Sequence, residues 1–162
     1  MSEEMREEFL MRFQGNDACN LEENIAFEIE QEDEKILLGF CVMGGIFSEG
    51  IDLKEDSLIG TIIVGTGIPQ VGSERELLKK YFDSRGDQGF DYAYRYPGMN
   101  KVLQAAGRVI RTTEDIGIIA LLDERFLDYQ YKKMYPREWS QYTVVSANDI
   151  GKKVEKFWNE WL

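Results

Sequence analysis

The sequence predicts an α/β domain with a doubly wound, mainly parallel sheet flanked by helices. Three observations support this prediction. Short apolar runs alternate along the chain with segments of helical periodicity. The apolar runs are continuous rather than alternating, which is typical of strands buried on both faces. The length of 162 residues, 43% of them apolar, is sufficient for one domain with its own core.

The pattern of residues within each segment predicts whether it is a helix or a strand. A cap at Ser2 and apolar residues at four-residue spacing predict a helix that ends at Gly15, and similar spacing predicts a second helix over about 21–30. Continuous apolar runs predict buried strands at 35–42, 58–64 and 117–122, and helical periods lie near 74–83 and 98–111. A short strand at 142–145 and a terminal helix over 146–162 follow. The apolar stripe of that helix is interpreted as core, and its members are Ile150, Val154, Phe157, Trp158 and Trp161.

Composition excludes several classes of protein. No apolar run is long enough to span a membrane, and the acidic amphipathic start is not a secretory signal. The chain has two cysteines and no histidine, which excludes a zinc site, an iron–sulfur cluster and a histidine-based nucleophile within it. These features predict a reduced, cytoplasmic protein. They leave the oligomeric state open, with a monomer as the first expectation.

The net charge of −11 is concentrated at the start of the chain. Residues 1–34 hold 12 acidic and 2 basic residues, and the remainder is close to neutral. We therefore regard 1–34 as an acidic helical entry segment. No run of Lys and Arg is present, so the sequence gives no direct electrostatic signal for DNA.

The ligands of open α/β sheets bind at the carboxyl ends of the strands, so the loops after Val42, Val64 and Leu122 are the first places to examine. The loop at 43–53 is rich in glycine and polar residues. Glycines allow the backbone to approach a ligand closely. The alternative interpretation is a tight turn with polar side chains. The candidates in this loop are Gly45, Ser48, Glu49, Gly50 and Asp52.

A second candidate segment is Gln104-Ala-Ala-Gly-Arg-Val-Ile-Arg111. Gln104, Arg108 and Arg111 are spaced 4 and 3 apart, which places them on one face if the segment is helical. Two guanidinium groups on one face suit phosphate oxygens, whereas the alternative is a pair of solvated or salt-bridged arginines. The phosphate-cradling pattern G-x-x-x-x-G-K-[ST] is absent from the sequence, so the arginines are interpreted as half of a site. Asp123-Glu-Arg-Phe126 is interpreted as structural rather than as a Mg²⁺ ligand.

These segments resemble a known family. Ser48-Glu-Gly-Ile-Asp52, with Gly45 ahead of it, resembles motif V of superfamily 2 helicases of the DinG/XPD type, and Gln104–Arg111 resembles their motif VI, Q-x-x-G-R-x-x-R. Gly67-Ile-Pro-Gln70 and the stretch 115–126 are similar to further parts of the family, and the likeness runs from about 36 to 139. The resemblance implies that residues 1–162 are the second RecA-like motor domain of such a DNA helicase, without the first strand of that domain.

The resemblance also implies roles for the candidates. ATP and Mg²⁺ would be bound mainly by a first RecA-like domain of the same protein, which would be the partner of this chain. Arg108 and Arg111 would neutralise charge on the γ-phosphoryl group, with Arg111 as the arginine finger, and Gln104 would contact the phosphate or the attacking water. The nucleotide-coupling residues would be Glu49, Gly50 and Asp52. The contacts to single-stranded DNA would come from Gly45 and Ser48.

Other interpretations remain open at this point. The chain is expected to be a fragment of a longer protein rather than a stand-alone remnant, and alone it is expected to be inactive. One alternative is a non-catalytic α/β interaction module whose acidic first helices dock on a basic partner, and another is a small nucleotide-binding enzyme. The aromatic residues over 90–96 fit either a cover for the sheet or a stacking surface for single-stranded bases.

Overall fold

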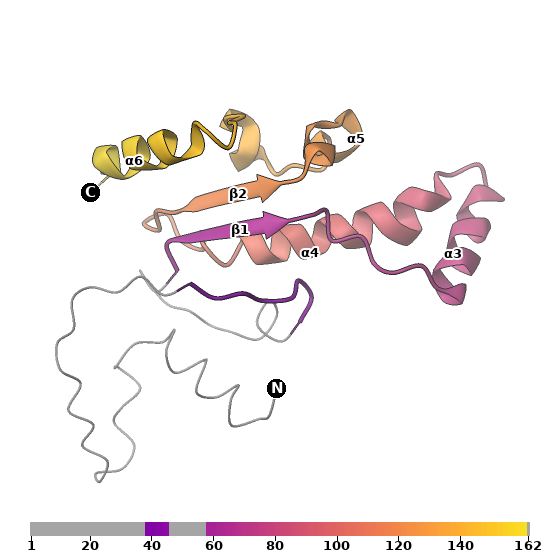
Figure 1. Ribbon diagram of the computed structural model, residues 1–162. Coiled ribbons are helices and arrows are strands. Elements are labelled where there is room, and N and C mark those ends of the chain that lie inside the picture. The colour runs from indigo at the N-terminus through magenta and orange to yellow at the C-terminus, as the bar shows by residue number, and fades with distance from the viewer. Residues whose placement is uncertain (1–37, 46–57, 162) are drawn as a thin grey trace, which may run out of the picture. The chain divides into compact units, whose positions relative to one another are not determined.

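The computed structural model describes residues 38–45 and 58–161 (Figure 1). The chain divides into two compact units, 1–58 and 59–162, and each is described by itself. The helices expected before residue 31, and the first residues of the strand expected at 35–42, lie outside the described residues.

The second unit follows the expected order of strands and helices. Its elements are β1 (Gly60–Val64), α3 (Ser73–Asp83), the π-helix η3 (Asp91–Arg95), α4 (Tyr96–Ala106), β2 (Ile118–Leu122), the 3₁₀ turn η4 (Glu124–Leu127), α5 (Tyr129–Lys132), the 3₁₀ turn η5 (Arg137–Gln141) and α6 (Ile150–Trp161).

A small parallel sheet lies at the centre of this unit. β1 and β2 pair in parallel, from Gly60 opposite Ile118 to Val64 opposite Leu122. Between them the chain crosses through α3, η3 and α4, and α4 packs along the sheet in the opposite direction to the strands (Figure 1). The parallel α/β architecture expected from the continuous apolar runs is therefore confirmed.

The core forms between α4 and the sheet. Met99, Val102, Ala106 and Val109 recur at spacings of three and four, and all are buried. Ile63 is the buried residue of β1. Further buried apolar residues come from η3 and from the segment after β2: Ala93, Tyr94, Phe126 and Tyr131.

The first turn of α4 lies directly against the loop after β1. A Cβ atom at Gly98 would be 2.7 Å from the carbonyl oxygen of Thr66 and 3.0 Å from the backbone nitrogen of Ile68. Both contacts are with backbone atoms, which have no rotamer through which to move away. Glycine is therefore needed at Gly98 for the helix to approach the loop this closely.

A buried carboxylate ties η3 to the region of α5. Asp91 is 2% exposed and forms ion pairs with Arg95 and with the Nζ of Lys133, the latter at 3.6 Å. The Arg95 guanidinium also lies over the ring of the buried Tyr131, 5.5 Å from its centroid. Two cations thus compensate the one buried acid.

Two of the expected strands are wrong in the described part. Residues 38–42 and 142–145 are irregular, and Phe40, Val42 and Val144 are 89%, 80% and 64% exposed. An apolar run becomes a strand only where a neighbouring strand supplies hydrogen bonds, and its composition does not reveal that partner.

The terminal helix is present, although its apolar stripe is not core. The carbonyl of Ser146 accepts hydrogen bonds from the backbone N–H groups of Asp149 and Ile150, and α6 begins at Ile150. No residue of α6 is buried, and Trp161 is 59% exposed. The helix is amphipathic, as expected, but the apolar side chains of the stripe are half-buried or exposed in the described structure. No helix among the described residues is long and apolar enough to cross a membrane.

Candidate functional site

The arginine-bearing segment begins as a helix and ends as a turn and a loop. The helix expected over 98–111 stops at Ala106, with Gly107 as its C-cap. Beyond it the hydrogen bonds tighten to three-residue spans, from Arg108 N–H to the Ala105 carbonyl and from Val109 N–H to the Ala106 carbonyl. Glycine is a poor helix former and favours helix ends, which explains the early stop.

The assumed helical face is therefore wrong, although the three side chains remain close in the chain. Gln104 is exposed on the last turn of α4, Arg108 is half-buried in the following turn, and Arg111 is exposed in the loop beyond. The structure thus presents the two guanidinium groups from a turn and a loop rather than from a helical stripe.

The turn that carries Arg108 is packed against the entry to β2. Val109 is 4% exposed, and a Cβ atom at Gly117 would lie only 2.3 Å from its Cγ1. The same Cβ atom would be 3.0 Å from the carbonyl oxygen of Ile59, which accepts a hydrogen bond from Ile118 N–H. The absence of a side chain at Gly117 lets the turn lie flat on the start of the sheet.

An aspartate closes the loop that begins at Arg111. One oxygen of Asp115 accepts hydrogen bonds from the backbone N–H groups of Arg111 and Thr112, both at 2.7 Å. The hydroxyl of Thr112 accepts a third bond from Glu114 N–H at 3.2 Å. These backbone donors, Arg111 first, hold the pKa of Asp115 below its usual value, because they stabilise the carboxylate. The loop backbone is thus fixed beside Arg111.

This site lies at the amino-terminal edge of the sheet. α4 starts beside the loop after β1 and ends beside Gly117, just before β2, so it spans the sheet from its carboxyl edge to its amino edge (Figure 1). The arginines therefore lie outside the loops after Val64 and Leu122. The rule for open α/β sheets concerns loops after strands, whereas this segment leads into a strand.

The other sequence candidates are placed only in part. Gly45 belongs to the first unit, where it closes a turn by donating its N–H to the Val42 carbonyl at 2.9 Å. Gly44 has a φ of 79°, in the region that favours glycine. Ser48, Glu49, Gly50 and Asp52 lie outside the described residues. Of the candidates that the structure describes in the second unit, Gln104, Arg108 and Arg111 follow one another along the end of α4 and the turn and loop after it.

The carboxyl edge carries an acid that is already engaged. Asp123 follows β2 and accepts three hydrogen bonds from Arg125, from its backbone N–H, its Nε and its Nη2 at 2.7–2.9 Å. The side-chain bonds are the main reason that the pKa of Asp123 is lowered. This geometry supports the structural interpretation of Asp123. Across residues 38–45 and 58–161, no three acidic or cysteine side chains cluster as a metal site would require.

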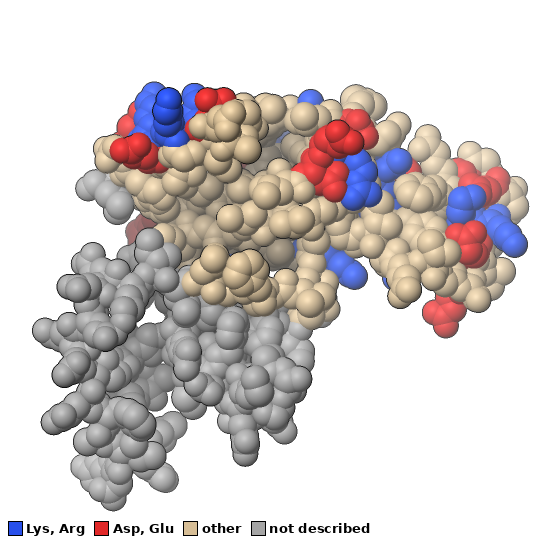
Figure 2. Space-filling view, in the orientation of Figure 1, with Lys and Arg blue, Asp and Glu red and all other residues tan. Residues whose placement is uncertain are grey.

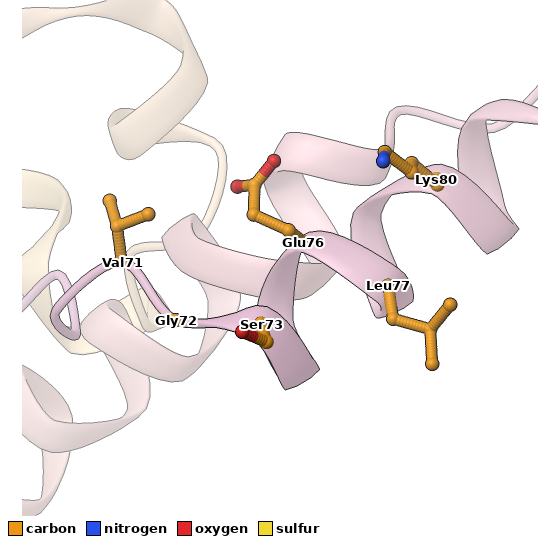
Figure 3. Close-up of a pocket in the computed structure, with 6 residues that line it drawn as sticks. All are labelled: Val71, Gly72, Ser73, Glu76, Leu77 and Lys80. Carbon is orange, nitrogen blue, oxygen red and sulfur yellow. The ribbon is translucent and has the colours of Figure 1, made fainter.

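A cavity of about 530 Å³ lies at the start of α3, and no candidate from the sequence lines it. Figure 3 shows its lining, with Glu76 and Leu77 pointing to different sides of α3. Its lining residues are Val71, Gly72, Ser73, Glu76, Leu77 and Lys80. On the face shown in Figure 2, charges of both signs are interspersed over α3 and α6 rather than gathered into one basic surface.

Two positions at the site have roles that the sequence reasoning did not assign. Asp115 and Gly117 were noted only as part of the stretch that follows the arginines. In the sequence, Asp115 is an acid four residues after Arg111, and Gly117 is a glycine immediately before an apolar run. These two features could have indicated their roles.

Comparison with known proteins finds that the chain is similar to part of several helicases. A family model described as the helicase C-terminal domain matches residues 1–142. A probable ATP-dependent helicase of Methanocaldococcus jannaschii is 27% identical over 84% of this chain and 22% of its own length. A regulator of telomere elongation helicase 1 homolog of Caenorhabditis elegans is 29% identical over 82% of this chain and 14% of its own.

A bacterial DNA helicase is also similar to part of this chain. The ATP-dependent DNA helicase DinG of Photobacterium profundum is 36% identical over 55% of this chain and 13% of its own length. The chain thus spans 13–22% of the length of these three relatives. No solved structure matches it significantly.

Proposed function

The chain belongs to the helicase C-terminal domain family, and from this membership we propose that it is the second motor half of an ATP-dependent DNA helicase. In this proposal ATP is bound between this chain and a first RecA-like motor domain of the same protein. The observation that carries the proposal is the family match over residues 1–142, together with the braced turn and loop that present Arg108 and Arg111 at one edge of the sheet.

The proposed chemistry is neutralisation of charge during phosphoryl transfer. In the transition state negative charge spreads over the γ-phosphoryl oxygens, and a positioned guanidinium stabilises it. The Arg111 loop is held by Asp115 and the Arg108 turn by the contact of Val109 with Gly117, so neither backbone has to reorganise when charge develops. We assign Arg111 as the arginine finger, Arg108 as its companion and Gln104 as the contact to the phosphate or the attacking water.

Motif V is proposed to couple the nucleotide to the arginine segment. This role for Glu49, Gly50 and Asp52 is supported by the family match over residues 1–142, which covers both Ser48–Asp52 and Gln104–Arg111.

The proposed contacts to DNA are to its backbone. The amide of Gly45 and the hydroxyl of Ser48 would donate to phosphate oxygens of single-stranded DNA, which carry no sequence information.

ATP and Mg²⁺ are proposed to be held mainly outside this chain. Asp123, the acid at the end of β2, already accepts three hydrogen bonds from Arg125 and is poorly suited to bind a cation. The residues that fit the nucleotide are the arginines, whose forked donors match phosphate oxygens. Bound ATP would supply the γ-phosphoryl group, and Mg²⁺ would neutralise part of the phosphate charge. We therefore expect this chain alone neither to hydrolyse ATP nor to unwind DNA.

The test is ATP turnover by the complete protein with Arg111→Ala. We expect a loss of about 10³-fold or more, which is typical of an arginine finger. Arg111→Lys is also expected to be impaired, because an ammonium group does not reproduce the guanidinium fork. Arg137→Ala is the matched control, since Arg137 is an exposed arginine on η5 outside the site. Turnover within a few-fold of wild type for Arg111→Ala would refute the assignment and favour a non-catalytic interaction module.

A further inference from the structure

α3 carries an aromatic surface that the proposed motor chemistry does not use. No residue of α3 is buried, and Tyr81 is 48% exposed. In Figure 1 α3 lies beyond the carboxyl end of β1, at the opposite edge from the arginine loop. An exposed aromatic surface of this kind is characteristic of an interaction site.

The rings form an ordered ladder, defined here as Tyr81, Phe82 and Tyr92. Phe82 and Tyr92 stack with centroids 4.1 Å apart and planes 10° from parallel, and Tyr81 meets Phe82 edge to face at 5.4 Å. Tyr92 also meets Tyr96 at 5.2 Å with the ring planes nearly perpendicular, and it remains 40% exposed. The ladder therefore presents rings already oriented by their neighbours, so little side-chain entropy remains to be lost on binding.

A guanidinium flanks the ladder. The Arg85 group lies over the Tyr81 ring, 4.6 Å from its centroid. Two nearby acids are engaged with other groups, Asp83 with Lys79 at 2.8 Å and Glu76 with the hydroxyl of Tyr94 at 2.5 Å. Segment 73–89 as a whole carries four acidic and four basic residues. It is electrically balanced, so a ligand would be held by the rings more than by charge.

We propose that the ladder, with Arg85, is a stacking surface for unpaired bases of single-stranded DNA. The inference rests on the proposed function and adds a subsite to it. Every base has a π-face, so exposed rings bind single strands without sequence preference, and arginine adds a cation–π contribution. Leu77, an exposed aliphatic residue of α3, lines the cavity at the start of that helix and is not part of the ladder.

The structure also selects the residues to test. Tyr94, inside the aromatic run at 90–96, is 3% exposed and donates its hydroxyl to Glu76, so its replacement would disturb the fold rather than a binding surface. Tyr92 and Tyr81 are accessible. Tyr129 on α5 is 77% exposed and outside the ladder, which makes it the matched control.

The experiment measures the affinity of this chain for a fluorescein-labelled 15-nucleotide oligo(dT), by anisotropy at low salt. Tyr81→Ala and Tyr92→Ala should each weaken binding by about fivefold or more, the lower range for loss of one base–aromatic stack. Tyr92→Phe and Tyr129→Ala should leave the affinity unchanged. Arg85→Gln should also weaken binding, because it removes the cation–π contribution beside Tyr81.

Melting of each variant, followed by tryptophan fluorescence, shows whether it is folded. If an alanine variant is not folded, the leucine variant at the same position, Tyr81→Leu or Tyr92→Leu, replaces it. The proposal is overturned if the wild-type chain does not bind the oligonucleotide, if the ladder variants bind as wild type does, or if Tyr129→Ala weakens binding equally. Unchanged affinity in the ladder variants would point instead to a protein partner. Loss of ATP turnover in Arg111→Ala is a separate readout, so the motor assignment can stand if the ladder fails.

Discussion

Gly98 offers a direct test of how α4 is seated on the sheet. Replacing it by alanine adds a Cβ atom at 2.7 Å from the Thr66 carbonyl oxygen and 3.0 Å from the Ile68 nitrogen. Atoms at such distances repel, and these neighbours are backbone atoms that must move together with the loop. Since the same helix ends at the arginine turn, a shift of α4 is also transmitted to Arg108.

The magnitude follows from two opposing contributions. Overpacking a tight contact costs about 1–3 kcal/mol. Replacing a helical glycine by alanine returns about 0.5–1 kcal/mol through reduced backbone entropy in the unfolded chain. The net destabilisation of Gly98→Ala is therefore about 1–2 kcal/mol, which lowers the Tm by about 2–8 °C for a chain of this size.

A matched control exists in α6. Gly151 is also helical, and a Cβ atom there meets no atom within 4 Å. Gly151→Ala should therefore stabilise the chain by about 0.5–1 kcal/mol and raise the Tm by about 1–4 °C. The assay is thermal unfolding followed by tryptophan fluorescence, because the three tryptophans, Trp139, Trp158 and Trp161, all belong to the second unit. If Gly98→Ala were as stable as Gly151→Ala, the close approach of α4 to the loop would be refuted.

Two further predictions concern the carboxylates that hold the site and the core. Asp115→Asn should destabilise the chain at neutral pH, because a carboxylate with a lowered pKa contributes stability above its usual value of 3.8 and loses it as the pH falls through its folded value. Urea unfolding of wild type and variant should therefore converge below pH 3.8, and a constant difference would contradict this account. Asp91→Ala leaves Arg95 and Lys133 without their buried counter-charge. It should lower the free energy of unfolding by about 2–3 kcal/mol. This is less than the cost of breaking a fully buried ion pair, because both cations remain partly exposed to solvent. Glu114→Ala, an exposed acid, is the control in the same urea titration, and an equal effect would argue against the buried pair.

Periodicity in the sequence correctly predicted those strands and helices of the second unit that pair or pack with another element. The runs 58–64 and 117–122 are β1 and β2, because each finds its partner in the other. The helical period near 74–83 is α3. The run at 142–145 has the same apolar character but no partner strand in the described structure, so composition alone misassigned it.

The helical geometry that the sequence predicted for the arginine segment is wrong. The glycine at position 107 was interpreted as a small residue within a helix, whereas it ends α4 and moves Arg108 and Arg111 off the helical face. The arginine segment leads into β2, so it lies at the amino end of that strand rather than in a loop after a strand. The clamp from Asp115 depends on a loop closure that spacing alone does not reveal.

The most direct test of the account is a structure of the complete protein with ADP, Mg²⁺ and aluminium fluoride, which mimics the transferring phosphoryl group. We expect the Arg111 guanidinium to donate to the fluoride group at about 2.7–2.9 Å, the range of charge-assisted hydrogen bonds. Arg108 should lie on the same side of the nucleotide. A bound transition-state mimic with Arg111 directed away from it would contradict the claim that this edge of the sheet completes a triphosphate pocket.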